Sequence, residues 1–114
     1  MVAPVKELSG YKGMWLFAAF DLPVGTRKAR RAYTQFRKSL LREGFMMLQY
    51  SVYARYCPGE ESSEATRRHV RLALPDEGRV RLVSITDRQF EKMEVFDGKT
   101  REKVEDPPAQ FMLF

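Results

Sequence analysis

One carboxylate and a row of cations are the residues whose types and spacing suggest chemistry. Asp21 closes the apolar stretch FAAFD, and a run of basic residues follows shortly after it. An acid at the end of a strand is most often a turn residue, and a basic helix face is most often only solvated. The alternative is a metal-binding acid on a protein that binds nucleic acid through its phosphates. The basic residues are Arg27, Lys28, Arg30, Arg31, Arg37, Lys38 and Arg42, with only Glu43 to offset them.

The apolar pattern predicts the elements that must position these residues. The stretch at 14–22 has almost no polar interruption, which is typical of a strand covered on both faces. Thr26 is expected to cap the first helix and Ser63 the second. A slip of the apolar phase between Leu82 and Val83 predicts a bulge or burial on both faces. We expect strands at 14–22, 45–57, 79–86 and 93–96, helices at 27–43 and 64–74, and a short turn at 87–92. The stretch 45–57 is too long for one ordinary strand, so it is either two strands divided near Gln49 and Tyr50 or one strand with a sharp bend there.

This order of elements is that of a ferredoxin-like α+β sandwich, βαββαβ, over residues 14–96. Residues 1–13 are predicted to form a flexible N-terminal arm, and the polar stretch 97–108 a linker that ends in two prolines. Two helices would cover one face of the sheet. The other face carries apolar side chains that nothing else in the chain is expected to cover. We therefore predict a homodimer formed through that sheet face.

Such a dimer gives Asp21 a chemical role. Side chains alternate along a strand, so Trp15, Phe17, Ala19 and Asp21 share one face, which is the dimer side if the helices cover the other. Two ionised carboxylates brought together by a two-fold axis repel unless one is protonated or a cation lies between them. Mg²⁺ suits such a site because it needs few protein oxygens and keeps several waters. It can lower the pKa of bound water and neutralise a phosphodiester under attack.

The end of the chain is apolar, reading QFMLF over residues 110–114. A chain end is rarely apolar without a surface to cover it. We predict an extra C-terminal strand that adds to a sheet edge, that of the partner subunit. The alternative is a frayed tail that packs on its own core. The residues expected to bind the partner are Phe111, Met112, Leu113 and Phe114.

Composition limits the remaining possibilities. A chain of 114 residues with 44% hydrophobic and 31% charged residues is one globular domain, and its net charge of +5 permits a polyanionic partner. The longest apolar run, Met14 to Phe20, is too short to span a bilayer, so we predict a cytoplasmic protein without a membrane partner. The single Cys57 and single His69 exclude an intrachain disulfide and an ordinary Cys/His zinc site within one chain. A bridge between two Cys57 copies is conceivable, and His69 is expected to be structural.

Three segments taken together resemble the CRISPR-associated Cas2 proteins, particularly the form that accompanies type II systems. They are FAAFDLP, the basic helix that ends in LLREGF, and LQYSVYARYC. The segments VSITDRQFEKM and PPAQFMLF are also similar to that subgroup. The resemblance extends over nearly the whole chain from about Gly10 onwards.

The resemblance implies a ferredoxin-like homodimer in which Asp21 is the acid linked to metal binding and nuclease activity, with Mg²⁺ or Mn²⁺ shared between two subunits. It matches Arg27, Lys28 and Arg30 to basic residues that follow this acid in the family. Some members carry a functional arginine where this chain has Met46 and Met47. It further implies a role in spacer acquisition, in which the Cas2 dimer bridges Cas1 integrase subunits and lies along the DNA backbone.

Three functions follow as hypotheses. The first is a binding scaffold that holds DNA through the helix cations and docks the integrase. The second is a metal-dependent endonuclease, a phosphodiester hydrolase acting on RNA or double-stranded DNA. The third, more distant, is an RNA-cleaving toxin (an mRNA interferase) of the same fold. Backbone contacts would give little sequence specificity in any of them.

Overall fold

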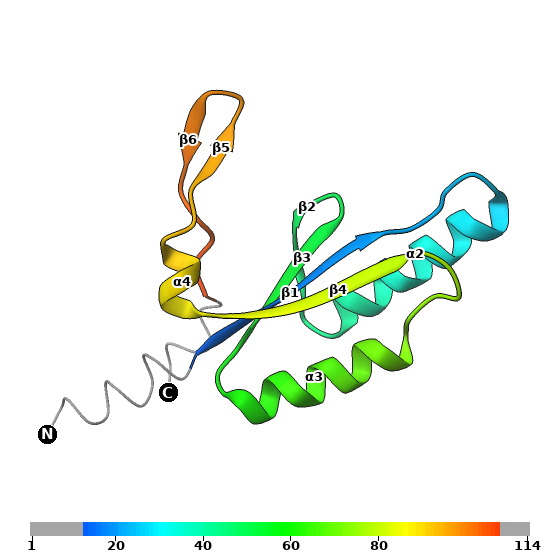
Figure 1. Cartoon of the computed structure of the whole chain (residues 1–114), viewed down its shortest axis with the longest axis horizontal. Coiled ribbons are helices and arrows are strands. Elements are labelled where there is room, and N and C mark those ends of the chain that lie inside the picture. The colour runs from blue at the N-terminus through cyan, green and yellow to red at the C-terminus, as the bar shows by residue number, and fades with distance from the viewer. Residues whose placement is uncertain (1–12, 108–114) are drawn as a thin grey trace, which may run out of the picture.

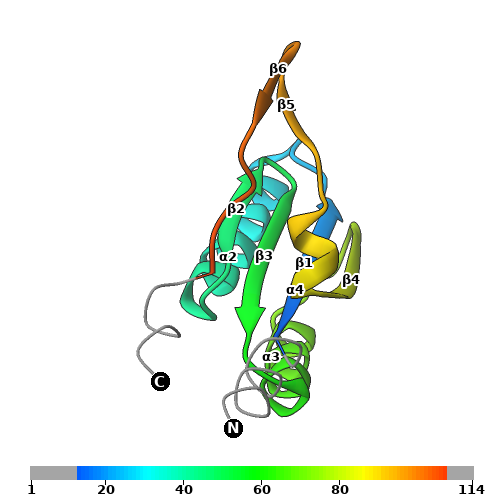
Figure 2. The ribbon, with the colours of Figure 1, turned by 90° about the vertical axis from the view of Figure 1, so that its left-hand side faces the viewer.

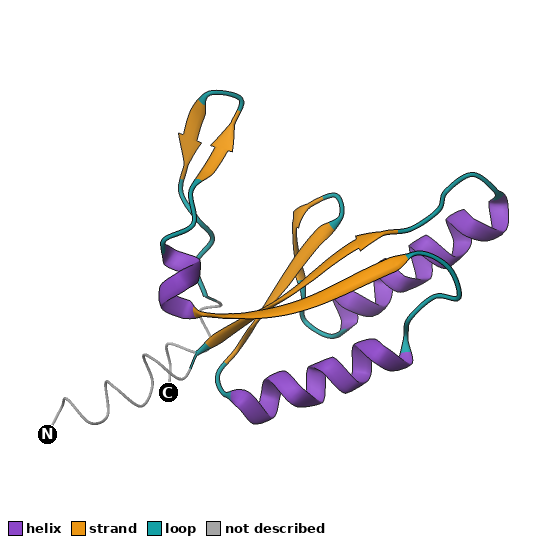
Figure 3. Cartoon of the chain, viewed as in Figure 1, coloured by secondary structure: helices purple, strands orange, loops and turns teal. Residues whose placement is uncertain are grey.

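The computed structural model describes residues 13–107. A four-stranded antiparallel sheet has the order β2-β3-β1-β4, and α2 and α3 lie against one of its faces (Figure 1). This is the ferredoxin-like arrangement that the sequence predicts (Figure 3). The elements are β1 (Met14–Asp21), α2 (Arg27–Arg42), β2 (Met46–Gln49), β3 (Val52–Cys57), α3 (Glu60–Leu72), β4 (Arg79–Thr86), α4 (Asp87–Glu91), β5 (Val95–Asp97) and β6 (Thr100–Glu102).

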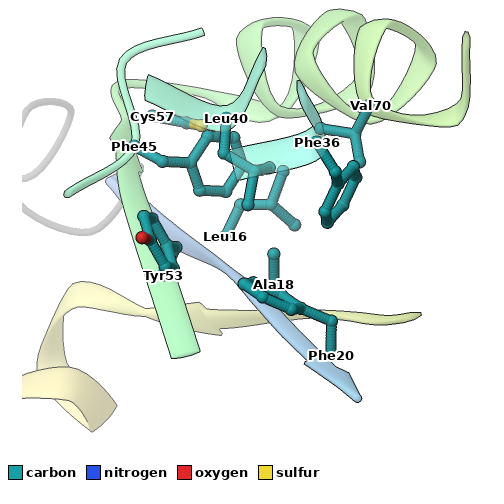
Figure 4. Packing of buried hydrophobic residues seen from close by; sticks show 9 residues of the cluster. All are labelled: Leu16, Ala18, Phe20, Phe36, Leu40, Phe45, Tyr53, Cys57 and Val70. Carbon is teal, nitrogen blue, oxygen red and sulfur yellow. The ribbon is translucent and has the colours of Figure 1, made fainter. Parts of the chain in front are cut away.

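The main core lies between the sheet and the two long helices. Leu16, Ala18 and Phe20 of β1 point toward this side, as the alternation along the strand predicts. They meet Phe36 and Leu40 of α2, and Figure 4 shows these side chains converging. The Phe20 and Phe36 rings pack edge to face with centroids 5.3 Å apart.

Cys57 lies in the same core and is fully buried. Burial raises the pKa of its thiol, which stays protonated and unreactive at neutral pH. A bridge between two Cys57 copies is excluded while the chain is folded, because neither sulfur can reach the surface.

A second cluster lies on the opposite face of the sheet and corrects one prediction. Trp15 stacks on Phe90 of α4 with ring centroids 3.9 Å apart, and its indole Nε1 donates a hydrogen bond to Asp87 Oδ1 at 2.8 Å. Figure 2 shows α4 on one side of the sheet and α2 on the other. The expectation that nothing in the chain covers this face is therefore wrong at one end. Farther along β4, Val83 remains 49% exposed.

The predicted start of the second helix is also wrong. The helix begins at Glu60 with Gly59 as its N-cap, and Ser63 is a buried residue of its interior. Glu60 and Glu61 in the first turn are favourable to the helix dipole, which offsets the missing side-chain cap. By contrast the Thr26 cap is confirmed, because its hydroxyl oxygen accepts a hydrogen bond from the Ala29 backbone N–H at 3.0 Å.

After residue 79 two further predictions are wrong and a third is confirmed only in part. The β1–β4 register is continuous from Arg79 to Thr86, so there is no bulge at Val83, which simply lies on the open face. The predicted turn at 87–92 is the helix α4, which begins with a capping box between Thr86 and Gln89. The predicted strand at 93–96 is β5, which pairs with β6 inside the predicted linker and projects as a hairpin (Figure 1). Residues 1–12 and 108–114, which hold most of the predicted arm and the tail strand, lie outside the described residues.

The stacking of α4 on the sheet gives a prediction on stability. Replacing Phe90 with alanine removes the ring stacked on Trp15 and should lower the free energy of unfolding by about 3 kcal/mol. The matched control is Tyr50→Ala, which removes an aromatic side chain that is 81% exposed and should cost no more than about 0.5 kcal/mol. Urea unfolding followed by circular dichroism at one fixed protein concentration measures both. Equal losses in the two variants would contradict the packing role assigned to α4.

Candidate metal and phosphate site

Asp21 is the last residue of β1 and its side chain is exposed. Because Phe20 points into the helix-side core, the alternation of the strand places Asp21 on the opposite face. Its direct neighbour across the β1–β4 ladder is Arg79, the first residue of β4. The prediction that the acid lies on the sheet face away from the helices is confirmed.

Gly78 positions the backbone at this end of the sheet. It has φ +103°, a left-handed conformation that favours glycine. A Cβ at this position would lie 2.9 Å from the backbone oxygen of Asp21 and would overlap the Leu22 side chain. The close approach of the two backbones therefore requires glycine, and it fixes where Asp21 leaves the sheet.

At this end of the sheet the carboxylate of Asp21 could serve as a ligand for a divalent metal ion. Within residues 13–107 there is no group of three or more His, Cys, Asp or Glu side chains that could hold an ion. A carboxylate oxygen is nonetheless the donor that Mg²⁺ and Mn²⁺ prefer, and Mg²⁺ is commonly held by one or two carboxylates with retained waters. The chemistry of Asp21 fits such an ion, but the donor set of one chain is incomplete without a second carboxylate from a second copy.

Helix α2 presents most of its cations to solvent. Thr26 caps the N-terminus of the helix, and a buried stripe that includes Phe36 and Leu40 determines which side of the helix faces the sheet. On the outer side an open depression runs along the helix surface. We call its cations the α2 patch, which consists of Arg27, Arg30, Arg31 and Lys38.

The other three predicted cations have different surroundings. Arg37 donates a hydrogen bond from Nε to the Tyr53 hydroxyl at 2.7 Å, which ties the helix to β3. Lys28 lines a separate depression together with Asp76 and Glu77, whose charges offset its own. Arg42 lies at the end of α2, where it donates to Ser39 Oγ at 3.1 Å. The seven predicted cations therefore do not form one surface.

The structure does not bring Asp21 and the α2 patch together within one chain. The patch lies on the outer side of the helix layer, whereas Asp21 lies on the sheet face that the helices leave open. A phosphate held by the α2 patch is therefore not presented to the acid of the same chain.

Two cations that the sequence interpretation missed lie on the face of Asp21. Arg79 is paired with Asp21, and Arg81 is paired with Ala19 two residues along the same face. Both arginines are exposed. The alternating pattern RVRLV was a usable signal, but its meaning depends on the pairing of β4 with β1, which the sequence interpretation did not specify.

His69 has a structural role, as expected. Its Nδ1 lies 2.8 Å from Glu43 Oε1 and joins the end of α2 to α3. The predicted partner-binding residues Phe111, Met112, Leu113 and Phe114 lie outside the described residues, so their docking stays a prediction. No helix in the described part of the chain is both long enough and apolar enough to cross a membrane.

Comparison with known proteins places this geometry in a family. The family model described as CRISPR associated protein Cas2 matches residues 14–93, which include β1 with Asp21, both long helices and β4.

Relatives match over almost the whole chain. A protein named CRISPR-associated endoribonuclease Cas2 from Parvibaculum lavamentivorans is 46% identical over 89% of this chain and 100% of its own length. Proteins of the same name from Paracidovorax avenae and Flavobacterium psychrophilum are 43% and 41% identical, over 94% and 95% of this chain and 99% and 94% of their own lengths. The ferredoxin-like fold, the family model and these relatives agree, and the chain belongs to the Cas2 family of CRISPR-associated proteins.

Proposed function

We propose that this protein is a DNA-binding scaffold of CRISPR adaptation, in which a homodimer bridges Cas1 integrase subunits and holds DNA by its backbone. The observation that carries the proposal is the α2 patch. Four cations line one open depression on the outer side of the molecule, where a polyanion can lie along the helix. Backbone contacts of this kind bind strongly and discriminate little between sequences, which suits a protein that captures DNA of many sequences.

The open face of the sheet supports the dimer. Beyond the area that α4 covers, Val83 is 49% exposed. Its cross-strand neighbour Phe17 lies at the border of that area, since it is only partly buried and its ring lies 5.8 Å from that of Phe90. A second copy related by a two-fold axis would cover the same residues on both chains. The α2 patch would remain free in such a dimer because it lies on the other side of the sheet.

A second function, metal-dependent cleavage of phosphodiesters, is favoured by Asp21 and by the relatives that are named endoribonucleases. In the dimer the Asp21 carboxylates of two copies would hold Mg²⁺ or Mn²⁺, which supplies charge neutralisation and an acidified water when bound. The family assignment favours either role over the RNA-cleaving toxin, and the genes beside this one would separate them. Cytoplasmic location is part of the same proposal.

The first prediction of this proposal concerns the acid. Asp21→Asn keeps the shape of the side chain and removes its charge, and its cost in stability should be small because the residue is exposed. Cleavage of RNA or double-stranded DNA in Mn²⁺ should fall by at least about a hundredfold, because a metal ligand is removed. Spacer acquisition in cells should be retained, because the scaffold does not depend on the acid. Cleavage that survives in rigorously purified Asp21→Asn protein would assign the activity to another group.

The second prediction concerns the α2 patch. The double variant Arg27→Gln/Arg31→Gln should weaken binding to duplex DNA and reduce the salt dependence of log K by about two, one for each cation that no longer binds a phosphate. The control Arg88→Gln/Lys92→Gln removes the same charge from the other side of the sheet, at α4. Fluorescence anisotropy over a salt series measures both slopes. If the salt dependence of log K fell as much in the control variant as in the patch variant, the effect would come from net charge and not from the α2 patch.

The third prediction concerns the tail. Deleting residues 110–114 removes the apolar segment predicted to bind a partner and should weaken the complex with Cas1 by tenfold or more, about 1.4 kcal/mol. Size-exclusion chromatography of the full-length and shortened chains, each alone and with the integrase, separates loss of the dimer from loss of the complex. An unchanged complex together with unchanged spacer acquisition would contradict the role of the tail.

A further inference from the structure

We propose that Arg79 and Arg81 form a second phosphate-binding site, on the open face of the sheet, that holds a nucleic-acid phosphodiester beside Asp21. The inference deepens the proposed function, since it rests on the chain binding nucleic acid. It names which side chains position the phosphate at the acid, a task that the α2 patch cannot perform from the other side of the molecule.

The register of the sheet places the three groups together. Arg79 is directly opposite Asp21 in the antiparallel ladder, and such neighbours have Cβ atoms about 4.5–5.5 Å apart. Arg81 lies two residues farther along the same face, about 7 Å along the strand. Gly78 holds the adjoining backbone against Asp21 and Leu22, so the backbone positions that carry the acid and the first arginine are fixed relative to one another.

The hydrogen bonds among the described residues do not use these two guanidinium groups. Three other arginines donate structural hydrogen bonds: Arg37 to Tyr53, Arg55 to Thr66 at 2.6 Å and Arg67 to Ser84 at 2.7 Å.

Arg79 and Arg81, in contrast, take part in no side-chain hydrogen bond or ion pair between described residues, and neither does Asp21. All three are exposed. Two exposed guanidinium groups that no other residue in the range 13–107 engages in a hydrogen bond are available to bind an external anion.

The chemistry of the pair selects a phosphate. A guanidinium presents parallel N–H donors that match two oxygens of a phosphodiester, and an arginine contact of this kind fixes orientation as well as distance. Two such groups along one strand would hold one phosphate close to the carboxylate. A single acid without these cations would repel the phosphate electrostatically.

The position of the pair is compatible with the proposed dimer. Asp21 and Arg79 form the last pair of the β1–β4 ladder, whereas the exposed Val83 and the partly buried Phe17 lie farther along the strands. A two-fold axis that passes close to this charged end would bring the two Asp21 carboxylates together and leave the adjoining edge of the interface open. A strand of nucleic acid can reach the acid there.

The test is a double-mutant cycle on nucleic-acid binding without metal. The probes are a fluorescein-labelled duplex DNA and a single-stranded RNA of the same sequence, in buffer containing EDTA, with anisotropy followed over a salt series. The variants are Arg79→Gln, Arg81→Gln and Asp21→Asn, with Arg31→Gln from the α2 patch as the matched removal of one charge. Circular dichroism confirms that each variant is folded.

Arg79→Gln should weaken binding several-fold and reduce the salt slope by about one, and Arg81→Gln should do the same. Asp21→Asn should strengthen binding, because a carboxylate no longer opposes the phosphate. The increase in affinity from Asp21→Asn should be smaller in the Arg79→Gln background, because Asp21 and Arg79 act on the same phosphate. The increase should be unchanged in the Arg31→Gln background, because Arg31 binds a different phosphate. An effect confined to one probe identifies whether the site takes DNA or RNA.

Unchanged affinity and slope for Arg79→Gln on both probes would overturn the proposal. Weakened binding that is additive with Asp21→Asn would also overturn it, since the phosphate would then lie away from the acid. Either failure is distinct from failure of the scaffold, which the Arg27→Gln/Arg31→Gln variant tests separately.

Discussion

The packing of β1 against α2 and α3 is the constraint from which the rest of the molecule follows. Leu16, Ala18 and Phe20 must be buried beneath the helices, and a strand has only two faces. Their burial therefore forces Asp21 onto the other face. A slip of one residue in the register of β1 would exchange the two sets and place the acid in the core, where an unpaired carboxylate is costly.

The same constraint divides the positive charge of the protein between two surfaces. The α2 patch points away from the sheet, while Arg79 and Arg81 lie on the face of Asp21. One surface is suited to holding a long polyanion and the other to presenting a single phosphate to an acid. In the proposed function, binding and cleavage would therefore depend on different residues, so that one could be retained in a protein that lacks the other.

The sequence predicts well whatever depends on local pattern. The alternation of β1, the Thr26 cap and the stripe of α2 are all readable from neighbouring residues, and the face of Asp21 follows from them. Features that depend on contacts between distant segments were missed. The stacking of Phe90 on Trp15 joins residues 75 positions apart, and the pairing of Arg79 with Asp21 joins residues 58 positions apart. No local pattern specifies either contact. Gly59 as a cap was missed because Ser63 is the stronger cap residue by type.

The charges around Asp21 also bear on how metal and substrate would depend on each other. In the proposed dimer the guanidinium groups of Arg79 and Arg81 outnumber the carboxylates, so a divalent cation approaching the site alone meets net positive charge and is opposed. A bound phosphodiester supplies the missing negative charge and further oxygen ligands, which Mg²⁺ readily accepts from substrates. Metal and nucleic acid would then each raise the affinity of the site for the other, by the same factor. An acid with two arginines on its own sheet face is therefore suited to hold a metal when nucleic acid is present, and only weakly when it is absent.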